Sequence, residues 1–322
     1  MKKKLVWLLI LSLVVSVVLV GCGTKKAEKY PSKDITMIIA FTAGGSSDVQ
    51  ARIVEKYFKQ EFGVNTIITY KTGAGGAVGF GEIAKAKPDG YTIGGINVPH
   101  IVLQPLGQET QFTPDSFEYI AQVVNDPTVI AVKKDSPIKD LNDLIERAKK
   151  EPEKVTLGNV GTLTGHHITS LEFMDKTNTK FTLIPYKGAA DEIAALLGGH
   201  VDAIVGNLND VMRDTDKIRV LAIATKERHK MAPDWPTFKE QGVDLVSGIT
   251  RHFAAPKGTP PEIVKRLREG FKNITSKPEY LEDMKKIGQP AEYLDGPEVE
   301  KMVKEESIKA KALLEKYGLL KK

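Results

Sequence analysis

Three short segments are rich in glycine or hydroxyl residues and have the composition of anion-binding loops. They are GGSS at residues 44–47, GAGG at 73–76 and GTLTG at 161–165. Glycine lets the main chain approach a ligand closely, and Ser or Thr hydroxyls donate hydrogen bonds to an anion. We expect such loops to hold a carboxylate through amides and hydroxyls, without an arginine. The alternative for each loop alone is an ordinary turn in which Ser47 or Asp48 only caps a helix.

Nucleotide and metal chemistry are poorly supported by the same segments. Residues 73–79 follow an expected strand as a dinucleotide fingerprint does, but the next strand ends in Asn97 where ribose recognition needs an acid. The adjacent pair His166 and His167 lacks the i, i+4 spacing of a helical zinc site, so we expect these histidines to cap or pack. We expect no cofactor and no metal ligand.

Hydrolase signatures are missing from the printed sequence. It contains no GxSxG elbow, no HExxH motif and no cysteine placed as a nucleophile. Asp48 and Asp202 could act as bases, but the sequence pairs neither with an activated group. We therefore expect a binding protein with no catalytic residues, and an enzyme built on the same fold is the rival interpretation.

Strands and helices alternate along the chain, which predicts an α/β fold with largely parallel sheets. In such sheets ligands bind at the carboxyl ends of the strands, where the glycine-rich segments stand. The expected strands are residues 35–40, 66–70, 91–96, 129–132, 155–158, 181–185, 201–205 and 219–225, and the expected helices are 49–62, 78–86, 141–150, 166–176, 191–197, 262–274 and 298–317.

The two blocks of alternating elements predict two αβ lobes around a ligand cleft. We expect a discontinuous lobe 1, formed by residues 31–126 and 226–322, and a lobe 2 formed by residues 127–225. The chain would cross between lobes twice, because five prolines precede two final helices that return to lobe 1.

The first 22 residues have the pattern of an export signal. Three lysines precede an almost wholly aliphatic stretch at residues 5–20, and LVGC follows at 19–22. LVGC resembles the lipobox of bacterial lipoproteins, which implies that Cys22 is acylated, so we predict a signal peptide at 1–21 and a lipidated tether at 22–30. The alternatives are a retained transmembrane anchor, for which sixteen apolar residues are short, and an unmodified Cys22.

Charge gives no support for a nucleic-acid surface. The formal net charge is +5, and three of the positive charges are leader lysines. No cluster of Lys and Arg interleaved with aromatic residues stands in the remainder. We expect no nucleic-acid partner.

Several motifs together resemble the substrate-binding receptors of the tripartite tricarboxylate transporter family, also called Bug receptors. They are YPSK at 30–33, FTAGGSSD at 41–48, GAGG at 73–76, KPDGYT at 87–92, PYKGA at 185–189, LGGHVD at 197–202 and APKGTP at 255–260. The resemblance covers residues 30 to about 290. It implies a periplasmic-binding-protein type II fold that closes on a small organic acid.

The resemblance also implies a set of ligand-binding positions. The first cleft loop would supply Phe41, Thr42, Gly45, Ser46 and Asp48, its counterpart would supply Gly161, Thr162 and Thr164, and the remaining positions would be Asp202, Asn97, His100 and Asn207. The last three would set specificity.

One segment departs from the family pattern. The family often has Trp shortly before APKGTP, where this chain has Thr250, Arg251 and His252. Arg251 either contacts a second carboxylate of the ligand or pairs with a surface acid, and the sequence leaves both open.

The resemblance implies an extracytoplasmic, lipid-anchored receptor, which we expect to be a monomer. It would capture a carboxylate by clamp closure and deliver it to the membrane subunits of a tripartite tricarboxylate-type transporter. A di- or tricarboxylate, an aromatic acid and an acidic amino acid all remain candidate ligands. An accessory of a two-component sensor is the alternative role.

Overall fold

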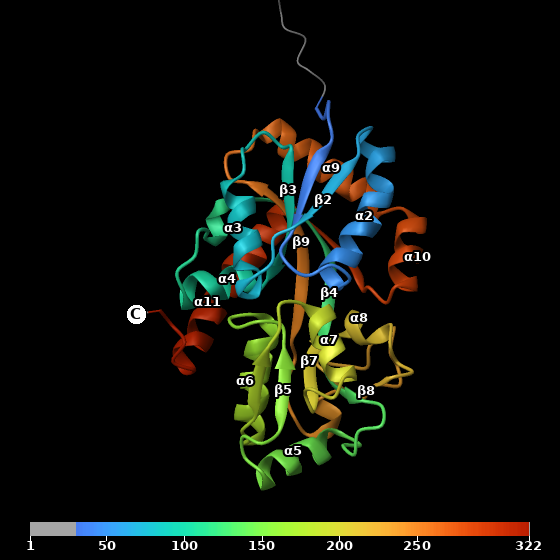
Figure 1. The fold of residues 1–322 in the computed structure, drawn as a ribbon. Coiled ribbons are helices and arrows are strands. Elements are labelled where there is room, and N and C mark those ends of the chain that lie inside the picture. The colour runs from blue at the N-terminus through green and yellow to red at the C-terminus, as the bar shows by residue number, and fades with distance from the viewer. Residues whose placement is uncertain (1–29, 322) are drawn as a thin grey trace, which may run out of the picture.

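The computed structural model describes residues 30–321, which form two αβ lobes joined by long strands (Figure 1). The expected α/β class is confirmed. Among residues 30–321, no helix combines the length and the apolar character needed to cross a bilayer. The predicted signal peptide and Cys22 lie outside the described residues.

Lobe 1 is built on a mixed sheet in the order β2-β1-β3-β9-β4, with β10 also paired to β4. Strands β1, β2 and β3 run parallel, whereas β9 is antiparallel to both β3 and β4. The bounds are β1 Ile35–Ile39, β2 Thr66–Tyr70, β3 Thr92–Val98, β4 Phe117–Lys133, β9 Gly248–Pro256 and β10 Ala291–Asp295.

Helices cover both faces of the lobe 1 sheet. Successive side chains of a strand point to opposite faces, and in this sheet both faces carry apolar side chains that pack against helices. Ile35, Met37 and Ile39 of β1 pack with α2, α9 and α10, and Ile38 packs in the cluster that includes α3, α4 and α11. The bounds are α2 Ser46–Phe62, α3 Ala77–Lys85, α4 His100–Gly107, α9 Pro261–Thr275, α10 Pro278–Lys286 and α11 Gly296–Lys316, with short 3-10 turns at Ala74–Gly76 and Pro114–Ser116.

Lobe 2 repeats the construction with β5 between β6 and β7, followed by the second half of β4 and then β8. Residues from α5 and α6 contribute to one apolar cluster of this lobe, and residues from α7 and α8 contribute to the other. The bounds are α5 Leu141–Lys150, β5 Thr156–Asn159, α6 Gly165–Thr177, β6 Thr182–Pro185, α7 Ala189–Leu197, β7 Ala203–Asn207, α8 Leu208–Met212 and β8 Ile218–Ile223, and a 3-10 turn spans Lys239–Gln241.

The chain crosses between lobes within β4 and again at the start of β9. The 17-residue strand β4 pairs with β9 up to Pro127, opposite Gly248, and with β7 from Thr128 onward. The second crossing, which the sequence predicts between residues 225 and 248, lies at the end of that range, at Gly248. Residues 226–247, which the sequence assigned to lobe 1, place Phe238 and Leu245 in the apolar core of lobe 2. Apolar side chains in an irregular segment gave no periodicity from which to assign them.

Candidate functional site

The carboxyl ends of β1, β3, β5 and β7 meet between the lobes and form a pocket. It encloses about 20 Å³, so the two lobes lie in contact around it. Both lobes and strand β9 contribute residues to its lining. The lining residues are Phe41, Gly45, Ser46, Ser47, Asn97 and His100 from lobe 1, Val160, His166, Ala189 and Asn207 from lobe 2, and Ile249 and Arg251 from β9.

Two helix N-termini face each other at this pocket. Gly45 precedes α2 in lobe 1 and Gly188 precedes α7 in lobe 2, so neither helix has a capping side chain directly before it. They approach closely, because a Cβ atom added to Gly45 would lie 3.7 Å from Ala189 Cβ. Since a helix N-terminus carries partial positive charge and unbonded N–H groups, the pair forms an anion-binding environment.

Asp48 shapes the lobe 1 loop instead of lining the pocket. Its carboxylate accepts hydrogen bonds from the Gly44 N–H at 2.7 Å and from the Tyr70 hydroxyl at 2.7 Å. Arg52 Nε lies 3.0 Å from the same carboxylate. These contacts fix the entry into α2, and thereby the position of Ser46 and its neighbours.

The lobe 2 loop at residues 161–164 packs on the glycine-rich loop at residues 73–76 of lobe 1. The Thr164 hydroxyl accepts from the His167 N–H at 3.3 Å and contacts the Gly161 carbonyl at 3.2 Å. A Cβ atom on Gly161 would lie 2.7 Å from Gly75 Cα, and one on Gly75 would lie 2.8 Å from the Thr162 carbonyl oxygen. Only glycine permits this approach, so the two loops form part of the contact between lobes.

A buried polar network connects the lobes beside the pocket. The Ser46 hydroxyl donates to Asp210 from across the cleft. Asp210 Oδ2 also accepts from the Asn207 side-chain amide at 2.9 Å, and Asn207 Oδ1 lies 3.0 Å from His166 Nε2. Gln289 of lobe 1 donates to the Ser46 carbonyl at 3.0 Å. Of these bonds, the one between Ser46 and Asp210 joins the two lobes and therefore forms only when they touch.

Arg251 is paired with a buried acid. Its Nη1 lies 2.7 Å from Asp126 Oδ2, and the other Asp126 oxygen accepts from the Asn209 N–H at 3.2 Å. Burial raises the pKa of Asp126 to about 6, although Arg251 acts in the opposite direction. Arg251 also lines the pocket. The acid with which it pairs is therefore buried at the cleft and does not lie on the surface. His252 is turned elsewhere, with Nε2 2.8 Å from Thr250 Oγ1.

The two pocket histidines favour their neutral forms. Burial lowers the pKa of His100 well below its ordinary value, and His166 and Arg251 lower it further. Burial also lowers the pKa of His166, against the opposing effects of Asn207 and Asp210. Neither histidine therefore supplies the positive charge for an anion at neutral pH, which leaves Arg251 and the helix N-termini.

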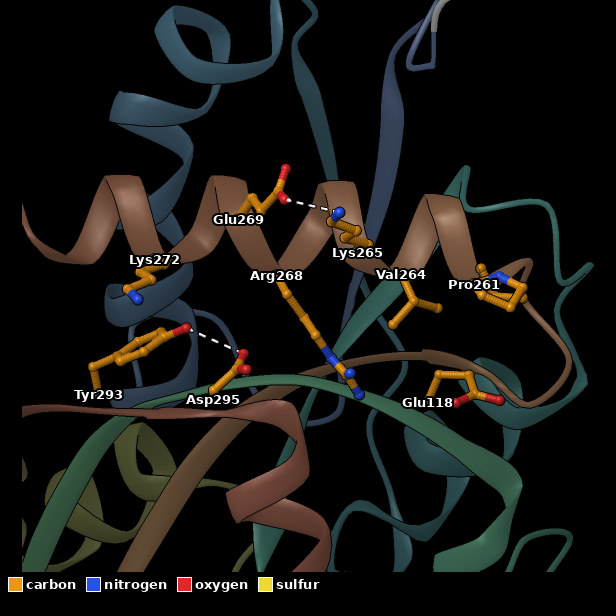
Figure 2. Close-up of a pocket in the computed structure, with 10 residues that line it drawn as sticks. Glu118, Pro261, Val264, Lys265, Arg268, Glu269, Lys272, Tyr293 and Asp295 are labelled. Atoms are coloured by element: carbon orange, nitrogen blue, oxygen red, sulfur yellow. Dashed lines mark hydrogen bonds and ion pairs between the residues drawn. The ribbon is translucent and has the colours of Figure 1, made fainter. Parts of the chain in front are cut away.

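A second hollow of about 450 Å³ lies on lobe 1 between α9, β10 and the start of β4 (Figure 2). Some of its polar side chains contact one another: Lys265 lies 3.9 Å from Glu269, and the Tyr293 hydroxyl donates to Asp295 at 3.3 Å. Arg268 donates to the Tyr119 carbonyl at 2.9 Å. This hollow belongs to one lobe, so the candidate site is the pocket to which both lobes contribute.

Comparison with known proteins shows the family to which the chain belongs. Residues 50–319 match the family described as "Tripartite tricarboxylate transporter family receptor". The chain belongs to this family. It is 33% identical over 298 residues to a protein of Cupriavidus necator named "UPF0065 protein in gbd 5'region", covering 92% of this chain and 91% of that protein. It is 30% identical to Protein BugT of Bordetella pertussis over 247 residues, 75% of this chain and 76% of that one.

Solved structures of tripartite tricarboxylate transporter receptors and related proteins share the fold. The periplasmic binding protein BugD superposes with a TM-score of 0.85 at 29% identity, covering 91% of this chain and 100% of that one. A structure titled as a periplasmic transporter gives 0.85 at 32% identity, covering 90% and 99%. The expected type II periplasmic-binding fold is therefore confirmed.

In this tripartite tricarboxylate transporter receptor, the positions named from the sequence fall into three places. Phe41, Gly45, Ser46, Asn97, His100 and Asn207 line the pocket. Thr42, Gly161, Thr162 and Thr164 lie at the adjoining contact between lobes. Asp48 lies behind its loop, and Asp202 accepts from Thr156 N–H and hydroxyl at 2.8 and 2.7 Å, at the amino end of β5 and away from the cleft.

Sequence reasoning assigned no binding role to four residues at the site: Ala189, Asp210 and Asp126, and His166, which was expected only to cap or pack. Ala189 stands in the recognised PYKGA motif, which places it after a strand and before a helix. His166 and Asp210 each follow the carboxyl end of a strand, a signal that could have found them. Asp126 gave no such signal, because its significance comes from Arg251, which lies far along the chain.

Proposed function

We propose that this protein captures a small organic carboxylate between its lobes and delivers it to the membrane subunits of a tripartite tricarboxylate-type transporter. The observation that carries this proposal is the meeting of α2 and α7 at one pocket, each preceded by glycine. Their N–H groups and dipoles favour an anion, and buried Arg251, which is paired with Asp126, supplies further N–H donors beside them. A planar carboxylate matches both kinds of donor.

Binding would proceed by closure of the clamp. A carboxylate first contacts the loop at residues 41–47, and lobe 2 then swings in because α7 gains its contacts only in the closed arrangement. Closure also forms the bond from Ser46 to Asp210 and the bond from Arg213 Nη1 to the Gly44 carbonyl at 3.0 Å. The closed, loaded receptor would be the form that docks on the transporter.

The proposal assigns the protein a binding role and no reaction. The carboxylates at the cleft are engaged, Asp126 with Arg251 and Asp210 with Ser46 and Asn207. The family match is to a receptor family. The protein would be anchored to the outer surface of the cell membrane by acyl chains on Cys22. More than one acyl chain is needed for stable anchoring.

The direct test is ligand-dependent stability. The chain from Gly23 onward is screened by thermal shift and titration calorimetry against mono-, di- and tricarboxylates and their matched amides. An acid at a hundred times its Kd should add about 2.7 kcal/mol to the free energy of unfolding, and its amide should not. A protein that responds to amides and acids alike, or to no acid, contradicts the proposal.

Two variants test whether the ligand binds at the helix N-termini. Ala189→Asp puts a carboxylate into the pocket at the start of α7, where it would occupy the anion site and abolish the response to acids. Ala190→Asp is the matched control, because it adds the same charge to the same helix turn but does not line the pocket. Loss of binding in both variants would argue against a site at this position.

A further inference from the structure

The hydrogen bonds around Asn207 fix the proton on His166. Asp210 as a carboxylate only accepts hydrogen bonds, so the Asn207 group that faces it at 2.9 Å is the amide nitrogen. The amide oxygen then faces His166 Nε2 at 3.0 Å and requires that nitrogen to carry a hydrogen. A neutral His166 protonated on Nε2 has an unprotonated Nδ1, which is an acceptor.

Three side-chain atoms of pocket-lining residues have no partner among residues 30–321: His100 Nδ1, His166 Nδ1 and Arg251 Nε. Two of them are complementary, because the Asn207 contact makes His166 Nδ1 an acceptor and Arg251 Nε can only donate. Both side chains are almost fully buried and line the pocket. They lie near each other, because both belong to the lining of one pocket of only about 20 Å³. A buried polar group left unsatisfied is costly, so both groups favour a ligand that partners them.

A carboxylate alone cannot partner both groups, because it only accepts. It can satisfy Arg251 Nε but offers nothing to His166 Nδ1. A hydroxyl both accepts and donates, so one hydroxyl oxygen can take the Arg251 hydrogen while its own hydrogen goes to His166. An ammonium group also donates, but it would stand beside the Arg251 cation, and Asp126 and Asp210 are already engaged.

We propose that the ligand is a hydroxy acid, whose carboxylate binds at the N-termini of α2 and α7 and whose hydroxyl is held between Arg251 Nε and His166 Nδ1. This inference rests on the proposed carboxylate-binding function and narrows its ligand class. His166 is then a specificity-determining residue, and Asn207 and Asp210 are positioning residues that set its tautomer.

The test compares acids that differ only in the hydroxyl. Calorimetry is run with malate against succinate, 2-hydroxyglutarate against glutarate and lactate against propionate, each also against the 2-amino analogue. At least one hydroxy acid should bind about ten- to a hundredfold more tightly than its deoxy and amino partners, which is the range for one unsatisfied buried group. His166→Phe should bring the hydroxy-to-deoxy ratio near one.

The matched control is His252→Phe, which replaces another buried histidine that does not line the pocket and should keep the preference. Because His166→Phe could misfold, nitrogen NMR of histidine-labelled wild-type protein gives a second readout. His166 should be the Nε2–H tautomer, and its Nδ1 signal should shift with the hydroxy acid but not with the deoxy acid.

The outcomes separate this inference from the function beneath it. Deoxy acids that bind as tightly as hydroxy acids, tighter binding of an amino acid, or an Nδ1–H tautomer would each overturn the hydroxy-acid assignment and leave carboxylate binding intact. Failure of every carboxylate to bind would remove the proposed function, and the present inference with it.

Discussion

Arg251 Nη1 lies 2.7 Å from Asp126 Oδ2 at the place where β9 and β4 pass from one lobe to the other. Both side chains are almost wholly buried, at 2% and 0% exposure. The pair thus stands on the hinge and at the floor of the pocket, since Arg251 also lines it. Arg251 therefore contacts the pocket and is also ion-paired with β4, one of the two strands about which the lobes must move.

Removing Arg251 should destabilise the protein in a pH-dependent way. The pKa of Asp126 in the folded chain is about 6, above its ordinary 3.8, so this residue's contribution to stability falls as pH rises from about 4 to about 6. Without Arg251 the pKa of Asp126 rises further. We expect Arg251→Met to cost about 3–5 kcal/mol at pH 8 and clearly less at pH 5, where Asp126 is protonated in both proteins.

Urea unfolding at pH 5, 6, 7 and 8 measures this difference. Arg228→Met is the matched control, because Arg228 pairs with Glu240 at the surface, where an ion pair contributes about 0–1 kcal/mol. An Arg251→Met deficit that stays constant across this pH range would contradict the coupling to Asp126.

Gly188→Ala should weaken ligand binding without unfolding lobe 2. Its φ of −171° is extended backbone that alanine adopts freely. The added Cβ would overlap Thr42 Oγ1 and lie 3.0 Å from Thr42 N, across the contact between lobes. We expect affinity for the identified acid to fall at least about tenfold, with the free energy of unfolding changed by less than about 1 kcal/mol.

Calorimetry and small-angle scattering with ligand report affinity and closure for this variant. Gly81→Ala within α3 is the control, because its Cβ would meet only Gln111, at 3.5 Å, and alanine favours helices. Closure of Gly188→Ala to wild-type dimensions would show that the contact at Thr42 does not limit it.

Glu192→Gln should stabilise the protein at alkaline pH. Glu192 is fully buried, and burial followed by Asp210 raises the pKa of its carboxyl well above the ordinary value. The folded state therefore holds a proton that the unfolded chain releases, and stability falls as pH rises above the unfolded pKa. The amide stays neutral, so the variant should exceed the wild type at pH 8 and match it near pH 4.5.

Chemical unfolding at these two pH values checks the prediction for Glu192. Glu305→Gln on the exposed face of α11 serves as the comparison and should stay within about 0.5 kcal/mol of the wild type at both. A Glu192→Gln variant that is less stable than wild type at pH 8 would mean that the ionised carboxylate is favoured in the folded state.

Cys22→Ser tests the predicted lipid anchor. Without the thiol no acyl chain can be attached, so the protein should appear in the soluble fraction or keep its leader. Cell fractionation and the mass of the N-terminal peptide distinguish these results from the wild type. A variant that is cleaved and still fractionates with membranes would refute anchoring through Cys22.

The fold could be predicted from sequence because its signals are local. Alternating apolar residues such as Ile35, Met37 and Ile39 mark a strand, and glycine-rich turns mark where helices begin. The recognised family motifs also led to six of the pocket-lining residues. Asp48 and Asp202 were harder to place, because side-chain direction depends on partners such as Tyr70 and Thr156.

The remaining parts of the site depend on contacts between segments far apart in sequence. Arg251 and Asp126 are separated by 125 positions, and no local signal indicates that they form a pair. The boundary at residue 226 could not be placed more closely within the predicted crossing for the same reason, since Phe238 packs in the core of lobe 2. Local periodicity carries no information on such pairings.

The two crossings lie opposite each other, since Pro127 on β4 pairs with Gly248 on β9. Lobe 2 therefore enters and leaves lobe 1 through two points one strand spacing apart. Lobe 2 is therefore inserted into lobe 1 at a single place. A short hairpin turn that connects Pro127 to Gly248 would replace lobe 2 and leave the strands of lobe 1 in their present order. We therefore expect that lobe 2 could be replaced by the corresponding lobe of another receptor while lobe 1 keeps its half of the cleft.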